Sequence, residues 1–265
     1  MRYGFCTGFA SNPPFGIDAT LEALVGAWGY DYIELPLMSI VALSEDEFTA
    51  MKQRIADAGL ACDSACNLFP GSVPVIGENV SEKVIRDYLD VGFTRAKEMG
   101  VKKLIFGSAG ARKLGSYDKE KADVQFLSCL GILEEYCTKY DMEVLIECIR
   151  RGEADYINTL AEGAAMAMKA QDAGYRHILL MADLFHMNCN GEPISDFEKY
   201  LPIVHHVHVC DVDREIPVGK FNDFLSDGVK IIKRYGYDRT VSYEAKRPAD
   251  MEAGKAACAL LKSYL

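Results

Sequence analysis

Four side chains that could bind a metal occur at the ends of apolar runs in the second half of the chain. They are Glu147 after EVLI, Asp183 after LLMA, His208 within HVHV, and Glu244 after TVSY. An unpaired carboxylate in such surroundings is costly, whereas one divalent cation could satisfy three carboxylates at once. Structural roles are also open to them, because Asp183 could cap the next segment and Glu244 could pair with Lys246 in solvent.

The donor types indicate which ion the four residues would prefer. Three carboxylates and one imidazole favour a hard, octahedral ion with open positions for substrate oxygens. We therefore predict Mn²⁺, with Mg²⁺ or Co²⁺ as alternatives. Zinc more often binds sites in which His or Cys predominates.

A second set of polar side chains follows the first at short spacing. Its members come six, three and six residues after the first three candidate ligands, and they are Glu153, His186 and Arg214. In the loops after their strands they could bind the hydroxyls of a sugar. Glu153 and Arg214 are equally consistent with ordinary surface charge, whereas His186 has apolar neighbours in DLFHMN.

The stretch Ile203–Arg214, IVHHVHVCDVDR, passes from apolar to polar residues. Alternation along a strand places His206 and His208 on one face, with Asp211 and Arg214 just beyond the strand end. This arrangement suits a metal and an oxygen-rich substrate. A half-buried strand with satisfied histidines has the same pattern, so the stretch alone does not decide between the two interpretations.

The elements that position these residues alternate along the chain. Strands are expected at 2–6, 32–35, 61–65, 103–106, 143–147, 177–183, 204–209 and 240–244. Helices are expected at 18–28, 44–58, 81–99, 118–140, 157–173, 194–200, 221–235 and 251–265. Short apolar strands with helices between them indicate a parallel sheet, and eight such units indicate an α/β protein with a (β/α)8 TIM barrel.

No linker or change of composition marks a second domain, so we expect a single domain over residues 1–265. The alternative fold, an open doubly wound sheet, lacks support because no GxGxxG follows the first strand. Active sites of barrels lie at the carboxyl ends of the strands, where the four candidate ligands would meet. Asn67 and Ser108, in loops at the same end, are further candidates for polar contacts.

Composition limits the range of functions. The 265 residues are 49% hydrophobic and 26% charged, which supports a sizeable core. The net charge of −10 argues against nucleic acid and anionic membranes as partners. The nine cysteines form no CxxC pair, and no export signal or membrane-spanning run is evident. We therefore expect a cytoplasmic protein.

Together the two sets have the spacing Glu147-x5-Glu153, Asp183-x2-His186, His208-x5-Arg214 and then Glu244. This pattern resembles the xylose isomerase-like TIM barrel superfamily. Within that superfamily, the chain is most similar to the D-tagatose and D-psicose (allulose) 3-epimerases and to their sugar-phosphate relatives. The resemblance covers nearly the whole chain, from GYDYIEL to the last helix.

The resemblance implies a role for each of the candidate residues. The metal ligands would be Glu147, Asp183, His208 and Glu244. Glu147 and Glu244 would also be the catalytic acid/base pair. The substrate contacts would be Glu153, His186 and Arg214. The likeness further implies a dimer or tetramer, for which Trp28, Tyr30 and Tyr32 could supply a subunit contact or could equally belong to the core.

The mechanism that the resemblance implies is proton transfer next to a ketose carbonyl, through an enediolate that the metal stabilises. Transfer between opposite faces gives epimerisation, and transfer between adjacent carbons gives aldose–ketose isomerisation. A phosphorylated substrate is left open, because loop cations could meet a phosphate. These cations are Arg112, Lys113, Lys220, Lys246 and Arg247.

Departures from the epimerase pattern put the identity of the substrate in doubt. The segment EIPVGKF after Arg214 keeps only Gly219 of a Pro-Gly-x-Gly turn, and the first rim, CTGFASNPPF, lacks the aromatic-rich segment of ketose epimerases. Lyases of the superfamily, of the inosose dehydratase or C-glycoside-cleaving type, share the ligand set and remain alternatives. Hydroxypyruvate isomerases resemble the chain less, since they usually carry Gln in place of His208.

Two further classes fit the sequence poorly. An endonuclease-IV-like phosphodiesterase needs a histidine-rich cluster with several zinc ions, but this acidic chain has five histidines. A non-catalytic carbohydrate- or metal-binding barrel would lose one of the two glutamates, and both Glu147 and Glu244 are present.

Overall fold

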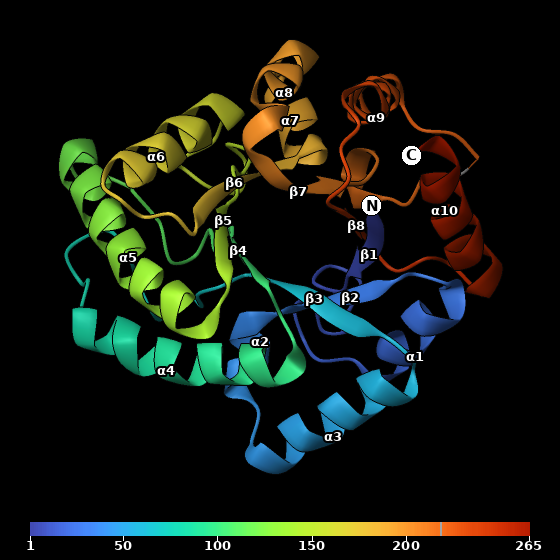
Figure 1. The fold of residues 1–265 in the computed structure, drawn as a ribbon, viewed down its shortest axis with the longest axis horizontal. Helices are drawn as coiled ribbons and strands as arrows, with labels where there is room; N and C mark the ends of the chain where they lie inside the picture. Colours follow the sequence, from blue (N-terminus) through green and yellow to red (C-terminus); the bar gives the residue numbers. More distant parts are fainter. Residues whose placement is uncertain (218) are drawn as a thin grey trace.

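The computed structural model describes residues 1–217 and 219–265. Parallel strands pair in chain order from β1 to β8 and close into a barrel (Figure 1). The strands are β1 (Arg2–Cys6), β2 (Tyr32–Pro36), β3 (Ala61–Cys66), β4 (Lys103–Phe106), β5 (Glu143–Ile146), β6 (Ile178–Asp183), β7 (Val204–Val209) and β8 (Thr240–Glu244). The predicted (β/α)8 TIM barrel is therefore confirmed.

Helices surround the barrel on its outer side (Figure 1). They are α1 (Ala19–Trp28), α2 (Leu37–Ala42), α3 (Glu45–Asp57), α4 (Glu82–Met99), α5 (Lys119–Tyr140), α6 (Leu160–Asp172), α7 (Leu184–Asn190), α8 (Ile194–Tyr200), α9 (Asp223–Tyr235) and α10 (Met251–Tyr264). Short 3₁₀ helices at Leu201–Ile203 and Val212–Arg214 flank β7.

Capping side chains set the helix boundaries, including those that the sequence analysis misplaced. The hydroxyl of Thr159 accepts from the backbone N–H of Glu162, so α6 begins at Leu160 and not at residue 157. Asn222 caps α9 in the same way, so that helix begins at Asp223. The short helices α2 and α7 were not predicted, because each follows a strand, β2 or β6, without an intervening loop.

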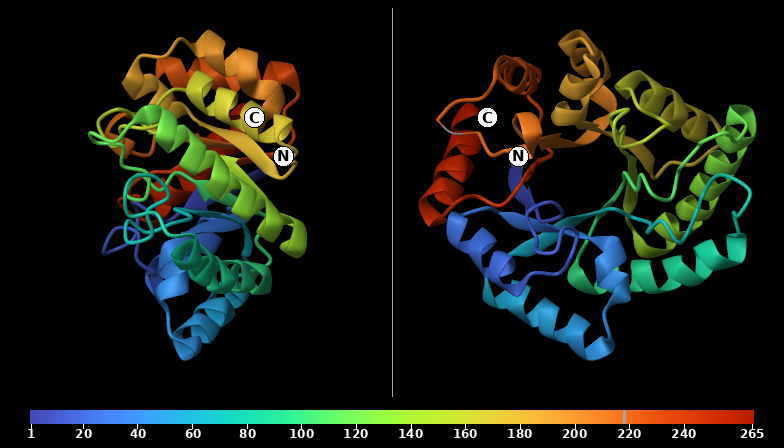
Figure 2. Two further views of the ribbon diagram at one scale, coloured as in Figure 1. Left: turned by 90° about the vertical axis from the view of Figure 1, so that its left-hand side faces the viewer. Right: turned by 180° about the vertical axis from the view of Figure 1, so that it is seen from behind.

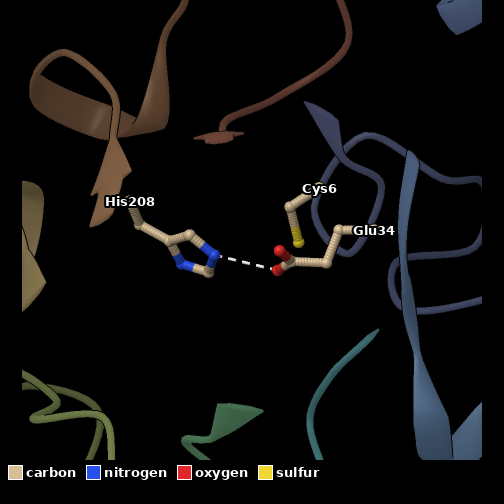
Figure 3. Close-up of side chains that lie close together, drawn as sticks. All are labelled: Cys6, Glu34 and His208. Carbon is tan, nitrogen blue, oxygen red and sulfur yellow. Dashed lines mark hydrogen bonds and ion pairs between the residues drawn. The ribbon is translucent and has the colours of Figure 1, made fainter. Parts of the chain in front are cut away.

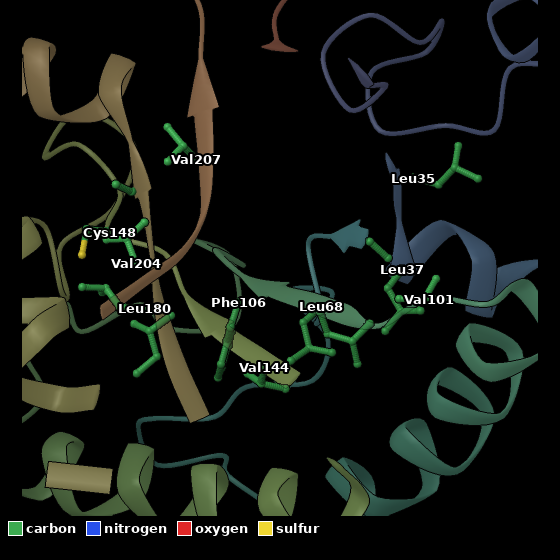
Figure 4. Close-up of a cluster of buried hydrophobic side chains, with 14 of the residues drawn as sticks. Leu35, Leu37, Leu68, Val101, Phe106, Val144, Cys148, Leu180, Val204 and Val207 are labelled. Carbon is green, nitrogen blue, oxygen red and sulfur yellow. The ribbon is translucent and has the colours of Figure 1, made fainter. Parts of the chain in front are cut away.

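Most of the core lies between the strands and the surrounding helices (Figure 4). Phe5, Trp28 and Tyr30 belong to this layer, where the Phe5 ring centroid is 5.3 Å from that of Trp28 and 5.4 Å from that of Tyr30. Tyr32 is also fully buried. Trp28, Tyr30 and Tyr32 are therefore core residues and not a surface available to another subunit.

A smaller apolar cluster fills the inside of the barrel. It consists of Cys6, Cys66, Ile105, Leu145 and Met181. Polar side chains occupy the rest of the interior, so the inside of the barrel is unusually polar in comparison with the layer beneath the helices.

Strand register determines which side chains meet at the carboxyl ends of the strands. Asp183 on β6 pairs with His208 on β7. Cys6 on β1 pairs with Glu244 on β8, and this pairing brings the first and last strands together (Figure 2). Residues far apart in sequence are thus held on adjacent strands. Among the described residues, no helix is long and apolar enough to cross a membrane.

Candidate active site

The four predicted ligands converge at the carboxyl ends of β5 to β8. Their ligand atoms, one each from Glu147, Asp183, His208 and Glu244, all lie within 4.8 Å of one another, and all four residues are buried. We call this group the rim cluster. Parallel strands present their carboxyl ends at the same edge, which explains how four separate apolar runs deliver their polar ends to one point.

His208 is oriented by a carboxylate on the far side of its ring. Its Nε2 lies 2.8 Å from Glu34 Oε1, a contact drawn in Figure 3. Because an ionised carboxylate only accepts hydrogen bonds, Nε2 carries a proton and Nδ1 is the ring nitrogen that faces the rim cluster. Although burial alone would lower it, Glu34 and Glu244 hold the pKa of His208 well above its ordinary value, so a metal ion would displace the proton on Nδ1. Nδ1 lies 3.6 Å from Glu147 Oε1 and 3.8 Å from Glu244 Oε2. This orientation is the one that a metal-binding histidine requires.

Asp183 has two roles, one for each carboxylate oxygen. Its Oδ1 accepts from the backbone N–H groups of Phe185 at 2.7 Å and His186 at 3.3 Å, and so caps α7. Its Oδ2 is buried and has no hydrogen-bond partner among the described residues. The capping role considered for Asp183 is therefore real, and it leaves the second oxygen free to bind a cation.

Glu147 is packed tightly at the end of β5. A side chain at Gly107 would be impossible without a shift, because a Cβ there would lie 2.0 Å from Glu147 Oε2. The backbone carbonyl of Glu147 accepts from Arg112 Nη2 at 2.7 Å. Arg112 is fully buried, so it holds the backbone of the site and does not supply a loop cation for a phosphate.

Glu244 is bound by a cation from the second set of residues. Arg214 Nη1 donates to Glu244 Oε2 at 2.5 Å, and both side chains are buried. Burial raises the pKa of the Glu244 carboxyl to about 7, despite the opposite effects of Arg214 and His208. Lys246 pairs instead with Glu215 in solvent, at 2.8 Å. The alternative role considered for Glu244, a solvent pair with Lys246, is therefore wrong.

The rim cluster satisfies the chemical requirements of a divalent cation site. Asp183 Oδ2 and His208 Nδ1 are buried atoms without a hydrogen-bond partner among the described residues. Buried polar atoms are almost always paired, so two such atoms in one cluster point to a missing partner. A cation among the three carboxylates would bind both atoms and offset the repulsion between the carboxylates.

The second set surrounds the opening above the rim cluster. The Arg214 guanidinium lies between two rings, with its carbon 3.8 Å from the centre of Phe9 and 4.5 Å from that of Phe185. Arg214 Nη2 contacts Glu153 Oε2 at 3.3 Å and His186 Nε2 at 3.2 Å. Burial lowers the pKa of His186, so this imidazole is neutral at pH 7.

A cavity of about 410 Å³ opens over these residues. Asn67 and Ser108 line it, as do Phe9 and Phe15 from the first rim. The first rim therefore supplies two phenylalanines to the cavity, and their rings pack edge to face with centroids 4.8 Å apart. Two aromatic residues separated by five others in the sequence do not stand out as a rich segment.

Two other regions singled out from sequence lie apart from the cavity. Asp211 caps the turn after β7 and accepts from Asn222 Nδ2 at 2.6 Å. Arg247 donates to the carbonyl of Ala10 at 3.1 Å and pairs with Asp18. In the EIPVGKF segment after Arg214, Val218 lies outside the described residues.

Sequence reasoning missed Glu34, the residue that orients His208. Glu34 lies in β2, is fully buried, and also accepts from Ser64 Oγ at 2.6 Å and Ser242 Oγ at 3.3 Å. The sequence did contain a signal, because Tyr32–Pro36 reads YIELP and places one acid within an otherwise apolar strand. His206 lies on the same face as His208, with ring centroids 4.9 Å apart, and contacts Glu34 from below the rim cluster.

Comparison with known proteins finds a matching family model and a sugar epimerase among the relatives. The sequence model of the xylose isomerase-like TIM barrel family matches residues 23–264. The D-psicose 3-epimerase of Agrobacterium fabrum is 25% identical over 205 residues, which cover 73% of this chain and 67% of that protein.

Two solved structures share the fold at lower identity. A 3-keto-D-glucoside 4-epimerase from E. coli has 19% identity and a TM-score of 0.79, with 99% of each chain covered. A D-allulose 3-epimerase from Methylomonas sp., solved with D-allulose, has 16% identity and a TM-score of 0.83, with 100% of this chain and 97% of that chain covered. At these identities the likeness shows the fold alone.

Proposed function

The chain belongs to the xylose isomerase-like TIM barrel family, and on this basis we propose that it is a metal-dependent sugar epimerase or isomerase. One observation carries the proposal: three carboxylates and an imidazole have ligand atoms within 4.8 Å of one another at the carboxyl ends of the strands. The similarity to a D-psicose 3-epimerase supports the same class of reaction.

In this proposal the rim cluster holds a single divalent ion. Mn²⁺ is the first choice and Mg²⁺ or Co²⁺ are alternatives, because oxygen ligands outnumber the one nitrogen ligand. Such an ion, when bound, polarises the substrate carbonyl and stabilises the charge that develops on its oxygen. Glu34 fixes the ring of His208 with Nδ1 directed at the rim cluster.

Glu147 and Glu244 are the proposed pair for proton transfer. They enter one cavity from β5 and β8, so each can approach the carbon next to the carbonyl from its own side. One removes the proton, which gives an enediolate of the sugar, and the other returns a proton to the opposite face. This sequence inverts the centre and is an epimerisation.

Arg214, His186 and Glu153 are the proposed substrate contacts. Arg214 lines the cavity, and its buried Nε has no hydrogen-bond partner among the described residues. The same guanidinium holds Glu244 through Nη1 and therefore orients a proton-transfer group and the substrate together. The neutral His186 ring lies beside it, at the edge of the cavity.

The charge of the cavity lining favours an unphosphorylated sugar. Of the described residues that line the cavity, Arg214 is the cation, and it is already paired with Glu244 and Glu153. A phosphate would therefore meet carboxylates without a free cation to balance it. The apolar lining residues, among them Phe9, Phe15 and Phe69, suit the C–H faces of a free ketose.

Proton exchange tests the proposal directly. The protein is incubated with Mn²⁺ and a panel of ketoses and ketose phosphates in heavy water, and carbon-bound protons are followed by NMR. We expect loss of a proton signal with a free ketose and none with its phosphate. At saturating Mn²⁺, Glu147→Gln or Glu244→Gln should abolish exchange, whereas Glu143→Gln, at the opposite end of β5, should retain it.

Silence across the panel with metal-loaded protein would overturn the epimerase proposal. It would favour the lyase alternatives, which would show new signals from a dehydrated or cleaved product. Exchange that persists in both glutamine variants would instead refute the assigned residues.

We also propose a cytoplasmic homo-oligomer, a dimer or tetramer, that needs neither nucleic acid nor membrane. The net charge of −10 argues against nucleic acid and anionic membranes as partners, and the nine free cysteines suit a reducing compartment. The oligomeric state is proposed from the resemblance to the epimerases alone. Size-exclusion chromatography with light scattering tests the oligomeric state, and a monomer at micromolar concentration would contradict it.

A further inference from the structure

Two cysteines inside the barrel lie next to the rim cluster but do not belong to it. Cys6 ends β1 and Cys66 ends β3, both are buried, and their Sγ atoms are 3.4 Å apart. Cys6 Sγ is also 3.7 Å from Glu244 Oε1. Ligand atoms of Cys6, Cys66 and Glu244 all lie within 4.8 Å of one another. We call these three residues the thiol cluster.

The strands hold the thiol cluster in place. Cys6 pairs in register with Glu34 on β2 and with Glu244 on β8, so it stands between two buried glutamates. Figure 3 shows its thiol beside the Glu34 carboxylate. Cys66 pairs with Pro36, the last residue of β2. Since both thiols stand on paired strands, their approach does not depend on the conformation of a loop.

Glu244 connects the thiol cluster to the rim cluster through different oxygens. Its Oε2 faces Arg214 at 2.5 Å and His208 Nδ1 at 3.8 Å. Its Oε1 faces the Cys6 thiol. The same carboxylate therefore borders one group of oxygen and nitrogen donors and a second group in which sulfur predominates.

We propose that Cys6, Cys66 and Glu244 form a second cation site, selective for a thiophilic divalent ion of the Zn²⁺ class. Thiolate ligands favour such ions over Mn²⁺ or Mg²⁺. Binding forms two sulfur–metal bonds and releases the two thiol protons to water. With zinc–sulfur bonds of about 2.3 Å in a tetrahedral site, the two sulfurs would be roughly 3.8 Å apart. The observed 3.4 Å needs only a small adjustment.

Another buried cysteine shows the surroundings expected of a thiol that does not bind a metal. Cys129, for example, is buried among apolar side chains of the outer core and has no metal-binding neighbour among the described residues. It behaves as a small hydrophobic residue. The thiol cluster differs because it brings two sulfurs and a carboxylate together beside an incompletely neutralised group of acids.

A cation in the thiol cluster would bind Glu244, which is one of the two glutamates in the proposed proton transfer. A thiophilic ion should therefore inhibit the enzyme while Mn²⁺ stays bound. This consequence rests on the proposed function, whereas ion binding itself does not.

Cadmium provides the probe, because its bond to thiolate gives an ultraviolet charge-transfer band. The Mn²⁺-loaded protein is titrated with Cd²⁺ in a Cys189→Ser background, since Cys189 is exposed. We expect the band to saturate at one Cd²⁺ per chain. It should disappear in C6S/C66S and in C6A/C66A and persist in C129S, while electron paramagnetic resonance shows bound Mn²⁺ in all of them.

A missing band in the parent protein, or a band that survives in both double variants, would overturn this inference. A Cd²⁺ band in a protein that binds no Mn²⁺ would support the thiol cluster as a cation site and would count against the proposed function. Loss of both the band and Mn²⁺ binding in C6S/C66S and C6A/C66A would also contradict the inference, because it would show a structural role for the pair.

Discussion

Two buried glutamates on either side of Cys6 differ in how completely their charge is satisfied. Glu34 accepts hydrogen bonds from His208, Ser64 and Ser242, at 2.8, 2.6 and 3.3 Å. Although burial alone would raise it, His208 and His206 hold the pKa of Glu34 well below its usual range. Glu244 has Arg214 as its hydrogen-bonded cation, and burial raises its pKa to about 7.

The difference separates two parts of the barrel. The polar groups around Glu34 satisfy one another, whereas those around Glu244 require a ligand. Around Glu34, hydroxyl and imidazole donors saturate the carboxylate, so this layer stabilises the fold by itself. Around Glu244, Glu147 and Asp183 add like charges, and two buried ligand atoms have no hydrogen-bond partner among the described residues. These are the donor set and the charge that a cation site requires.

The largest effect on stability is expected when Glu34, whose carboxylate accepts several buried hydrogen bonds, is removed. Glu34→Ala should lower the free energy of unfolding of the metal-free protein by about 3–5 kcal/mol, because it leaves buried donors without an acceptor. Urea unfolding measures the change. As the matched control, Asp87→Ala breaks an exposed pair with Lys83 and should cost about 0.2–1 kcal/mol. If both variants lowered the free energy of unfolding equally, the hydrogen bonds of Glu34 would not contribute more to stability than an exposed ion pair.

The two glutamates should respond to pH in opposite directions. The pKa of Glu244 lies near 7 in the folded state against 4.5 as its ordinary value. Its contribution to stability is therefore complete below pH 4.5 and is lost as pH rises through about 7, a change of about 3 kcal/mol in the metal-free protein. The pKa of Glu34 is depressed, so its contribution is present above the ordinary value and is lost as pH falls.

Unfolding at pH 5 and pH 7.5 checks this difference. Glu244→Gln should remove most of the loss of stability between these two pH values, and Glu34→Ala should not. An unchanged pH profile in Glu244→Gln would refute the raised pKa.

A smaller effect is expected for Glu147→Gln. The Glu147 carboxylate repels Glu244 but also lies 3.6 Å from His208 Nδ1, so neutralising it removes one unfavourable and one favourable contact. The free energy of unfolding of the metal-free protein should therefore change by no more than about 1 kcal/mol. Affinity for Mn²⁺ should fall at the same time. Calorimetric unfolding with and without Mn²⁺ measures both changes, and a larger loss of stability without metal would contradict the comparison.

The smallest effect on stability is expected for Glu153→Gln. Glu153 is partly exposed and pairs with Arg150 at 2.7 Å and with Arg214 at 3.3 Å. Its loss should change the free energy of unfolding by about 0.2–1 kcal/mol. We expect a higher KM for the sugar with metal binding unchanged. A loss of Mn²⁺ affinity would mean that Glu153 belongs to the rim cluster.

The fold and the rim cluster could be predicted because their signals are local. β6 and β8 end in a candidate ligand, β7 contains one near its end, and β5 is followed by one. The barrel architecture brings these strand ends together. The starts of α6 and α9 were misplaced because Thr159 and Asn222 cap these helices, and α2 and α7 were missed because they follow their strands directly.

The partners of the ligands were harder to predict because they depend on register across distant strands. Glu34 meets His208 across the barrel, 174 residues away in sequence, and nothing near either residue specifies that contact. The closeness of Cys6 to Cys66 also follows from strand pairing through β2. Phe9 and Phe15 reach the cavity through the shape of a loop, which no periodic pattern encodes.

Binding of Mn²⁺ tests the central claim most directly. Titration of the metal-free protein, followed by electron paramagnetic resonance, should show one bound Mn²⁺ per chain. At a free concentration of 100 times Kd the ion should raise the stability by about 2.7 kcal/mol. Asp183→Asn and Glu147→Gln should each weaken binding. A well-folded protein that takes up no Mn²⁺, Mg²⁺ or Co²⁺, or that binds Mn²⁺ equally well without these carboxylates, would contradict the account.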